Sequence, residues 1–207
     1  MNFLALSKRS VYRLALIPAA ALVFSCNNPG ATNEPVVDSA NTMGSLSDSA
    51  HGMEPVPMVQ HAEAIITGTS ADTSVTGTVK FDAADGKVKM DLEITIPAKA
   101  GKSVAVHIHE HGDCGDGGKM SHGHWNPTNK AHGKWGSAEF HLGDIGNVEL
   151  DSKGKGTLSM ETDLWTLGGT PDKNILNKAI IVHGGMDDYT TQPTGNAGSR
   201  IGCGVIQ

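Results

Sequence analysis

The feature that most constrains the fold is an unbroken alternation of apolar and polar residues over residues 87–96. Its apolar members are Val88, Met90, Leu92, Ile94 and Ile96. Successive side chains of a β-strand point to opposite faces, so the alternation predicts a strand with one buried face. Residues 75–81 repeat the pattern. The Ala-Asp-Gly sequence at 84–86 is typical of the hairpin turn that would join the two strands.

Short strands are also predicted at residues 60–69, 103–110, 147–151, 156–162, 178–184 and 200–206. Eight such strands indicate an all-β domain, a β-sandwich or flattened barrel. Two long connections, 111–146 and 163–177, interrupt the pattern, and connections of this length are commonly functional. The 26 glycines and 4% aromatic content exclude an ordinary helical bundle. The formal charge of −6 argues against a basic nucleic-acid surface, so no nucleic-acid partner is expected.

The first 25 residues have the organisation of an export signal. Lys8, Arg9 and Arg13 precede an apolar run over residues 14–24, which is too short to cross a bilayer as a stable helix. Ser25 and Cys26 follow directly, and this ending resembles a bacterial lipoprotein signal. The resemblance implies that Cys26 is acylated and becomes the first mature residue. An ordinary signal followed by an incidental cysteine is the alternative.

Removal of residues 1–25 takes away three cationic side chains and no acidic ones, which changes the formal net charge from −6 to −9. The mature chain is expected in the cell envelope, periplasmic or surface-facing, anchored by lipid to a bacterial membrane. Disulfides persist in such compartments.

Residues 26–57 are rich in Asn, Pro, Ala, Ser, Asp and Gly and have no periodicity, so a disordered tether is expected there, followed by a globular domain over 58–207. Near this boundary lie His51, Met53, Met58 and His61. Imidazole and thioether ligands suit copper. These four residues are either a copper-scavenging segment or ordinary linker residues.

The histidines of the domain are its candidate metal ligands. His107 and His109 lie on one face of a predicted strand, and two imidazoles at that spacing can share a metal ion. The later histidines, at 124, 132, 141 and 183, are joined by Asp144. Six histidines and a carboxylate exceed the needs of one mononuclear site. The alternative, a solvated histidine-rich surface, disagrees with the apolar sequence around the strand-borne histidines.

Four ordered motifs resemble the copper/zinc superoxide dismutase family. They are HIHEHGDC at 107–114, GHWNP at 123–127, HLGDIGN at 141–147 and GNAGSRIGCGV at 195–205. The resemblance covers residues 60–207, the whole globular part. It implies an eight-stranded antiparallel Greek-key barrel with two long functional loops. It also implies an enzyme that converts superoxide to dioxygen and hydrogen peroxide by copper redox cycling beside a structural zinc.

The resemblance also implies a role for each site residue. Copper would be bound by His107, His109, His124 and His183, and zinc by His124, His132, His141 and Asp144. His124 would bridge the two metals and take part in catalysis. Asp187 would accept hydrogen bonds from His107 and His132, and Arg200 would guide the superoxide anion to copper. Cys114 and Cys203 would form a disulfide.

Four points depart from the family pattern or leave alternatives open. The segment between Asp188 and Gly195 is short and contains no Lys or Glu, so guidance would depend on Arg200, the metals and Lys119, Lys130 or Lys134. The rate is therefore expected to depend on ionic strength more weakly, or in a different form, than that of an enzyme with long-range steering. His111 and His122 are additional to the implied ligands and are solvated loop residues or an accessory metal site. A non-catalytic copper/zinc storage or delivery protein of the same fold is the alternative function. The oligomeric state is not fixed, and a homodimer is compatible with the family.

Overall fold

The computed structural model describes residues 56–71 and 74–207. In these residues, eight strands form one antiparallel sheet, with two short 3-10 turns at Pro97–Lys99 and Lys119–Ser121 and no α-helix. The strands are β1 (His61–Gly68), β2 (Thr76–Ala84), β3 (Lys87–Thr95), β4 (Ser103–His109), β5 (Gly146–Glu149), β6 (Lys155–Thr162), β7 (Ala179–His183) and β8 (Arg200–Val205). The eight predicted strands are therefore confirmed, with shifts of up to three residues at their ends.

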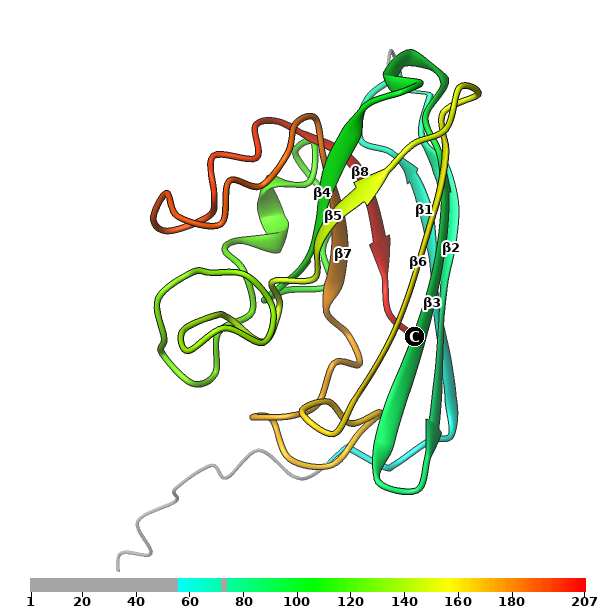
Figure 1. Cartoon of the computed structure of the whole chain (residues 1–207). Helices are drawn as coiled ribbons and strands as arrows, with labels where there is room; N and C mark the ends of the chain where they lie inside the picture. The colour runs from blue at the N-terminus through cyan, green and yellow to red at the C-terminus, as the bar shows by residue number, and fades with distance from the viewer. Residues whose placement is uncertain (1–55, 72–73) are drawn as a thin grey trace, which may run out of the picture. The chain divides into compact units, whose positions relative to one another are not determined.

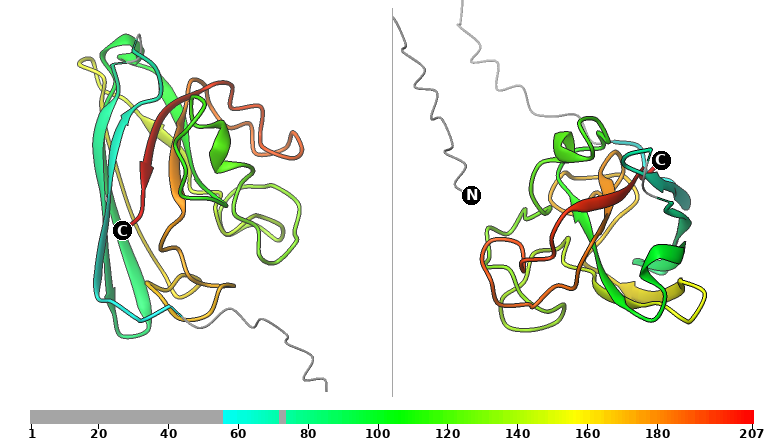
Figure 2. Two further views of the ribbon diagram at one scale, coloured as in Figure 1. Left: turned by 180° about the vertical axis from the view of Figure 1, so that it is seen from behind. Right: turned by 90° about the horizontal axis from the view of Figure 1, so that it is seen from above.

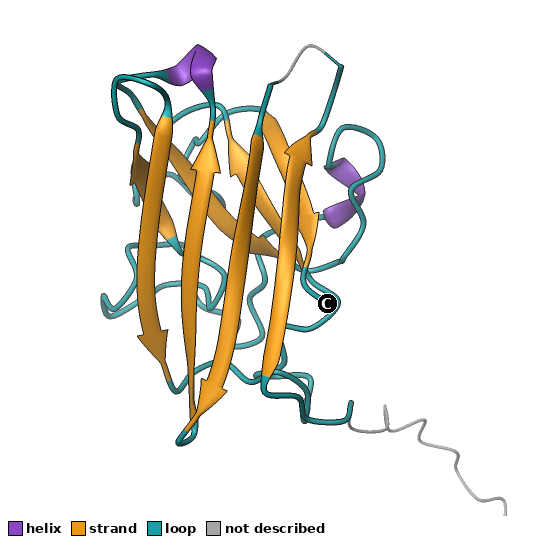
Figure 3. Ribbon diagram, turned by 90° about the vertical axis from the view of Figure 1, so that its right-hand side faces the viewer, coloured by secondary structure: helices purple, strands orange, loops and turns teal. Residues whose placement is uncertain are grey.

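The sheet is curled into a nearly closed barrel (Figure 1). Its strand order is β5-β4-β7-β8-β1-β2-β3-β6, and the two end strands, β5 and β6, contact each other. The β3–β4 and β6–β7 connections each cross from one half of the barrel to the other, which gives the Greek-key arrangement. Figure 3 shows the long strands of the β1-β2-β3-β6 half side by side. The all-β Greek-key prediction is confirmed.

The alternation in β3 places its apolar residues inside the barrel. Val88, Met90, Leu92 and Ile94 are buried, while their polar neighbours lie outside. Asp85 and Gly86 join β2 to β3 with positive φ angles of 52° and 76°, the backbone geometry of a two-residue hairpin turn. The predicted hairpin is confirmed, and its register brings Val79 of β2 opposite Leu92 of β3.

Three long connections leave the barrel: residues 110–145, 163–178 and 184–199. The first and third lie together outside the β4-β7-β8 half, as both views in Figure 2 show. The second lies at one end of the barrel and buries Trp165, Leu167 and Ile175 in the core. The connection at 163–178 therefore closes the barrel and contributes no side chain to the histidine cluster described below.

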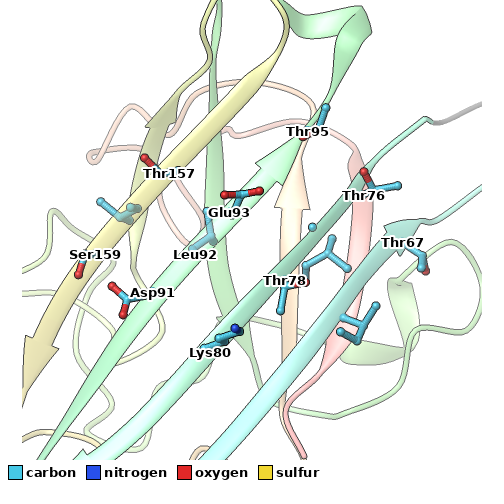
Figure 4. A pocket seen from close by; sticks show the side chains of 14 residues that line it. Thr67, Thr76, Thr78, Lys80, Asp91, Leu92, Glu93, Thr95, Thr157 and Ser159 are labelled. Atoms are coloured by element: carbon cyan, nitrogen blue, oxygen red, sulfur yellow. The ribbon is translucent and has the colours of Figure 1, made fainter.

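A surface pocket of about 840 Å³ lies on the outer face of β1, β2, β3 and β6 (Figure 4). Threonine and serine supply six of its fourteen lining residues and Lys80, Asp91 and Glu93 supply charges, but the lining contains neither histidine nor cysteine. The seven predicted metal ligands lie on β4, β7 and the 110–145 connection, in the other half of the barrel, so this pocket is not where metal chemistry would occur.

Candidate metal centre

The barrel and its loops bring together all seven predicted ligands. His107 and His109 are on β4 and His183 ends β7, while the 110–145 connection supplies the other four, His124, His132, His141 and Asp144. Each of the seven is at most 6% exposed. An isolated β-bridge between His109 and His124 fixes the loop histidine opposite the strand histidine. Since Val106 and Ile108 face the core, strand parity turns both β4 histidines outward, under the loops.

The seven side chains form two groups that share one residue. The first group is His107, His109, His124 and His183; the second is His124, His132, His141 and Asp144. In each group the candidate ligand atoms lie within 4.8 Å of one another. The ring centres of His107 and His124 are 4.0 Å apart. The shared position of His124 is the arrangement expected of an imidazole that bridges two metal ions.

Each of the six histidines has one buried ring nitrogen without a hydrogen-bond partner in the described part of the chain. These atoms are Nδ1 of His107, His132 and His141 and Nε2 of His109, His124 and His183. Buried polar atoms are normally satisfied, so unpartnered ones need an explanation. His132 Nδ1 lies 3.0 Å from Asp144 Oδ2 and His141 Nδ1 lies 3.3 Å from Asp144 Oδ1, but neither pair has hydrogen-bond geometry. The atoms converge in the way that ligands converge on a cation.

The opposite nitrogen of five rings is held by a partner that fixes the ring orientation. His107 Nε2 and His132 Nε2 each donate to Asp187 at 2.9 Å. His109 Nδ1 donates to the His122 carbonyl at 2.8 Å, and His183 Nδ1 lies 3.3 Å from the Gly198 carbonyl. For the shared ring, Nδ1 lies 2.7 Å from Asp144 Oδ1. Such partners select which nitrogen faces a metal.

Burial keeps three imidazoles of the first group, those of His109, His124 and His183, neutral. Desolvation, reinforced by the neighbouring His124, lowers the pKa of His109 well below its usual range. Desolvation together with the proximity of His107 lowers the pKa of His124 to about 4 and that of His183 to about 3. Metal ions bind neutral imidazole, so these rings are ready for a metal at neutral pH.

The second group is more anionic. Burial opposes ionisation of Asp144, but the hydrogen bond from the His124 ring and the close approach of the His132 and His141 rings hold its pKa well below the usual range. At His132 burial favours the neutral ring, yet Asp144 and Asp187 outweigh it and raise the pKa to about 9. The carboxylates therefore stabilise positive charge here, which suits a divalent ion with three nitrogens and one oxygen, the ligand set of zinc.

Asp187 lies between the two groups, as predicted. Its Oδ2 accepts from His107, and its Oδ1 accepts from His132 and, at 2.7 Å, from the Tyr189 amide. These donors outweigh burial and hold the Asp187 pKa well below its usual range. Gly195 has a φ of 69°, and any Cβ there would overlap Asp187 Oδ1. A glycine is therefore required at the position that covers this carboxylate.

Two positioning residues were not predicted. Asn147 makes two backbone hydrogen bonds to Asp187, donating from Nδ2 at 2.9 Å and accepting at Oδ1 from the amide at 2.8 Å. Gln192 pairs in the same two-fold way with the backbone of His132, at 2.9 Å each. Asn147 belongs to the HLGDIGN motif, which could have identified it. Gln192 has no such signal, because only the folded 184–199 connection brings it to His132.

Arg200 starts β8 and is held against the 110–145 connection. Its Nη1 donates to the Gly118 carbonyl at 2.6 Å and to Ser121 Oγ at 3.1 Å, and its Nη2 donates to the His122 carbonyl at 2.6 Å. The same His122 carbonyl accepts from His109. The guanidinium is therefore fixed relative to the first histidine group. The backbone carbonyls that hold it could not be identified from side-chain motifs.

The structure contains the Cys114–Cys203 disulfide that the resemblance implied, across a sequence separation of 89 residues. It joins the 110–145 connection to β8, the two segments whose contacts hold Arg200. The three lysines considered as anion guides have local partners: Lys119 pairs with Asp116, Lys130 with Glu139, and Lys134 lies over the Tyr189 ring.

Some predicted features are at the N-terminus. Cys26, His51 and Met53 lie outside the described residues, as does the export signal. Met58 is exposed, and the exposed His61 pairs with Asp82 at 2.6 Å. Among the described residues no helix is long and apolar enough to span a membrane.

Comparisons with known proteins agree with this geometry. A family model described as copper/zinc superoxide dismutase matches residues 75–206. The copper-zinc superoxide dismutase of Paramecium bursaria Chlorella virus 1 is 39% identical over 138 residues, which are 64% of this chain and 72% of the viral protein. The extracellular copper-zinc superoxide dismutase of Caenorhabditis elegans is 35% identical over 140 residues, 65% of this chain and 62% of that relative.

Among solved structures, the crystal structure of the clock protein EA4 matches with a TM-score of 0.62 and 34% identity, over 72% of this chain and 95% of that one. The family match runs over more than half of the chain and includes all seven buried ligand candidates. The chain therefore belongs to the copper/zinc superoxide dismutase family.

Proposed function

We propose that superoxide dismutation, the oxidoreductase reaction of this family, takes place in this chain at a dinuclear centre. Copper would be held by His107, His109, His124 and His183, and zinc by His124, His132, His141 and Asp144. The observation that carries this assignment is the set of six buried, unpartnered imidazole nitrogens, one on each histidine. No group within residues 56–71 and 74–207 satisfies these atoms, whereas two metal ions would satisfy all of them.

The donor sets fit the two metals differently. The first group offers four imidazoles, a set that suits copper. The second adds the ionised Asp144, a set that suits tetrahedral zinc. When bound, copper supplies one-electron redox chemistry for both halves of the dismutation, and zinc supplies fixed positive charge.

His124 is the residue best placed to handle a proton. Its Nδ1 faces Asp144 in the zinc group, and its buried Nε2 belongs to the copper group and has no protein partner. Dismutation consumes two protons as one superoxide is oxidised to dioxygen and the other is reduced to hydrogen peroxide. Nε2 of His124 would hold one of these protons and deliver it to the departing peroxide.

Arg200 would attract and orient the superoxide anion. Three hydrogen bonds to Gly118, Ser121 and His122 fix its guanidinium, and one of these acceptors also holds the copper-group residue His109. A fixed cation beside the reacting centre both raises the local anion concentration and orders the encounter. This placement distinguishes an enzyme from a copper store, which has no need of an anion guide.

The test is the rate of superoxide consumption by the full chain loaded with copper and zinc, compared with His183→Ala. A high rate that collapses in the variant would support the assignment. His61→Ala is the matched control, because His61 is an exposed histidine paired with Asp82 and remote in sequence from every ligand. Stoichiometric metal binding without a rate above that of buffer would instead favour storage or delivery.

We also propose that the chain is a bacterial lipoprotein, with a signal peptide at 1–25, a tether at 26–57 and the catalytic domain at 58–207. Acylation of Cys26 would anchor it to a membrane, with the domain in the periplasm or at the cell surface. The disulfide supports an oxidising compartment, and one of the relatives is named as extracellular.

Incorporation of labelled fatty acid in cells tests the anchor. Labelling that disappears in Cys26→Ser supports it, and equal labelling of both chains would refute acylation at Cys26. A homodimer, which the family resemblance admits, is tested by sedimentation of the purified full chain; a mass of two chains would support it.

A further inference from the structure

His122 has a backbone conformation that its side chain does not favour. Its φ is 61° and its ψ is −141°, a combination that glycine adopts readily and other residues rarely adopt. Its carbonyl faces inward and accepts from both His109 Nδ1 and Arg200 Nη2. A glycine would provide the same carbonyl at lower conformational cost. The presence of an imidazole at this position therefore needs a separate explanation.

The His122 ring lies beside that of His111. The two ring centres are 4.5 Å apart with an angle of 68° between the planes, and both residues are exposed. Glu110 completes a group whose candidate ligand atoms all lie within 4.8 Å of one another. This group shares no residue with the two buried groups.

The backbone holds these three residues in place. The Glu110 amide donates to the Gly123 carbonyl at 3.0 Å, and the His111 amide donates to the Ser121 carbonyl at 3.2 Å. Residues 110–111 and residues 121–123 are thus paired by backbone hydrogen bonds, as two short strands would be. Arg200 and His109 also fix the His122 carbonyl. Both rings are therefore attached to a constrained backbone, and less conformational entropy is lost when they bind a shared ligand.

The side chains of the group are not committed to other strong contacts in the described structure. Neither imidazole makes a side-chain hydrogen bond, and the only charged neighbour of Glu110 with a resolved effect is Lys178, whose ammonium lies 5.0 Å from the Trp125 ring centre. Burial lowers the Lys178 pKa and the Glu110 carboxylate partly opposes this. A lysine cation therefore acts on the carboxylate only at long range, and the two imidazoles are the main donors.

We propose that Glu110, His111 and His122 form a third metal site, which binds a divalent transition-metal ion at the protein surface. Two imidazoles and one carboxylate suit Cu²⁺ and Zn²⁺, and the usual order of affinities places Cu²⁺ first. The exposed position leaves the remaining coordination positions to water. The site is distinct from the dinuclear centre, so the proposal does not depend on which metals that centre holds.

The experiment is equilibrium dialysis of the full chain, already loaded with copper and zinc, against Cu²⁺ buffered by glycine. We expect one additional copper per chain in the parent. His111→Ala and His122→Gly should each weaken its binding about tenfold or more, because each removes one of the two imidazoles. Glu110→Gln should have a smaller effect, because both imidazoles remain and the amide oxygen of Gln can still act as a ligand atom.

His61→Ala is the matched control, since it removes another exposed histidine that lies next to a carboxylate. Equal copper binding by the parent and both site variants would overturn the proposal. So would loss of the additional copper in the His61 variant with retention in the site variants, because that result would place the ion near the N-terminus. Electron paramagnetic resonance of the additional copper should show nitrogen couplings in the parent that decrease in His111→Ala.

Metal content of the dinuclear centre and thermal unfolding identify variants that fail for structural reasons. His122→Gly relieves the unfavourable φ, so its unfolding temperature should be equal to or higher than that of the parent. If the His122 ring is instead retained for packing, the unfolding temperature of His122→Gly should be lower than that of the parent. That result would count against a metal-binding role. If that variant loses the dinuclear metals, His111→Ala decides the question, since His111 belongs to neither buried group and its backbone carries no hydrogen bond to Arg200 or His109.

Discussion

Replacement of Asp187 by Asn should weaken copper binding more than zinc binding. The change keeps the shape of the side chain but leaves one oxygen and one NH₂ group in place of two acceptors. Oδ1 accepts from two donors, His132 Nε2 and the Tyr189 amide, whereas Oδ2 accepts only from His107 Nε2. The remaining oxygen should therefore stay with His132 and Tyr189, and the NH₂ group should face the N–H of His107.

The magnitude follows from this asymmetry. Loss of the partner that orients a metal-ligating histidine typically reduces metal affinity about 10- to 100-fold, or about 1.4 to 2.7 kcal/mol. That loss should apply to copper, whose proposed ligand His107 loses its acceptor. In the variant two donors, the His107 N–H and the new NH₂ group, would face each other in a fully buried contact. Zinc affinity should change less, because His132 keeps its acceptor.

Competition with chelators measures both affinities on the full chain. Asp188→Asn is the matched control: Asp188 is adjacent in sequence but accepts only from Thr190 and Thr191 in the loop, so neither metal affinity should change. Equal losses of copper and zinc in Asp187→Asn, or an unchanged copper affinity, would refute the assigned orientation of the side chain.

Three further predictions concern the framework of the site. Replacing Cys114 and Cys203 by Ala should lower the free energy of unfolding of the metal-free chain by about 4.6 kcal/mol in the chain-entropy model for a loop of 89 residues; denaturant unfolding measures it, and a loss below about 1 kcal/mol would contradict the model. Gly195→Ala should displace Asp187 and leave purified protein with less copper and zinc than the parent, measured by elemental analysis, and full occupancy of both metals would disprove the overlap. Arg200→Gln should lower kcat/KM for superoxide about tenfold at low salt with unchanged metal content; an unchanged rate in stopped-flow measurements would remove the anion-guiding role.

The sequence by itself determined the strands and the chemistry of the ligands. The alternation over 87–96 has period 2, and no other regular structure buries one side of such a segment. The same rule put His107 and His109 on one face, because strand parity depends only on local backbone geometry. The motifs around His124 and His141 then identified a metal-binding family through residue types at fixed spacing, which require no knowledge of tertiary structure.

The tertiary structure alone decided which atoms meet. Gln192 reaches the backbone of His132, and the carbonyls of Gly118 and His122 hold Arg200, because loops far apart in sequence pack against the same half of the barrel. Backbone carbonyls are present at every residue, so no sequence pattern reveals which of them is used. The choice of ring nitrogen at each histidine is decided in the same way, since it depends on which partner the fold places behind the ring.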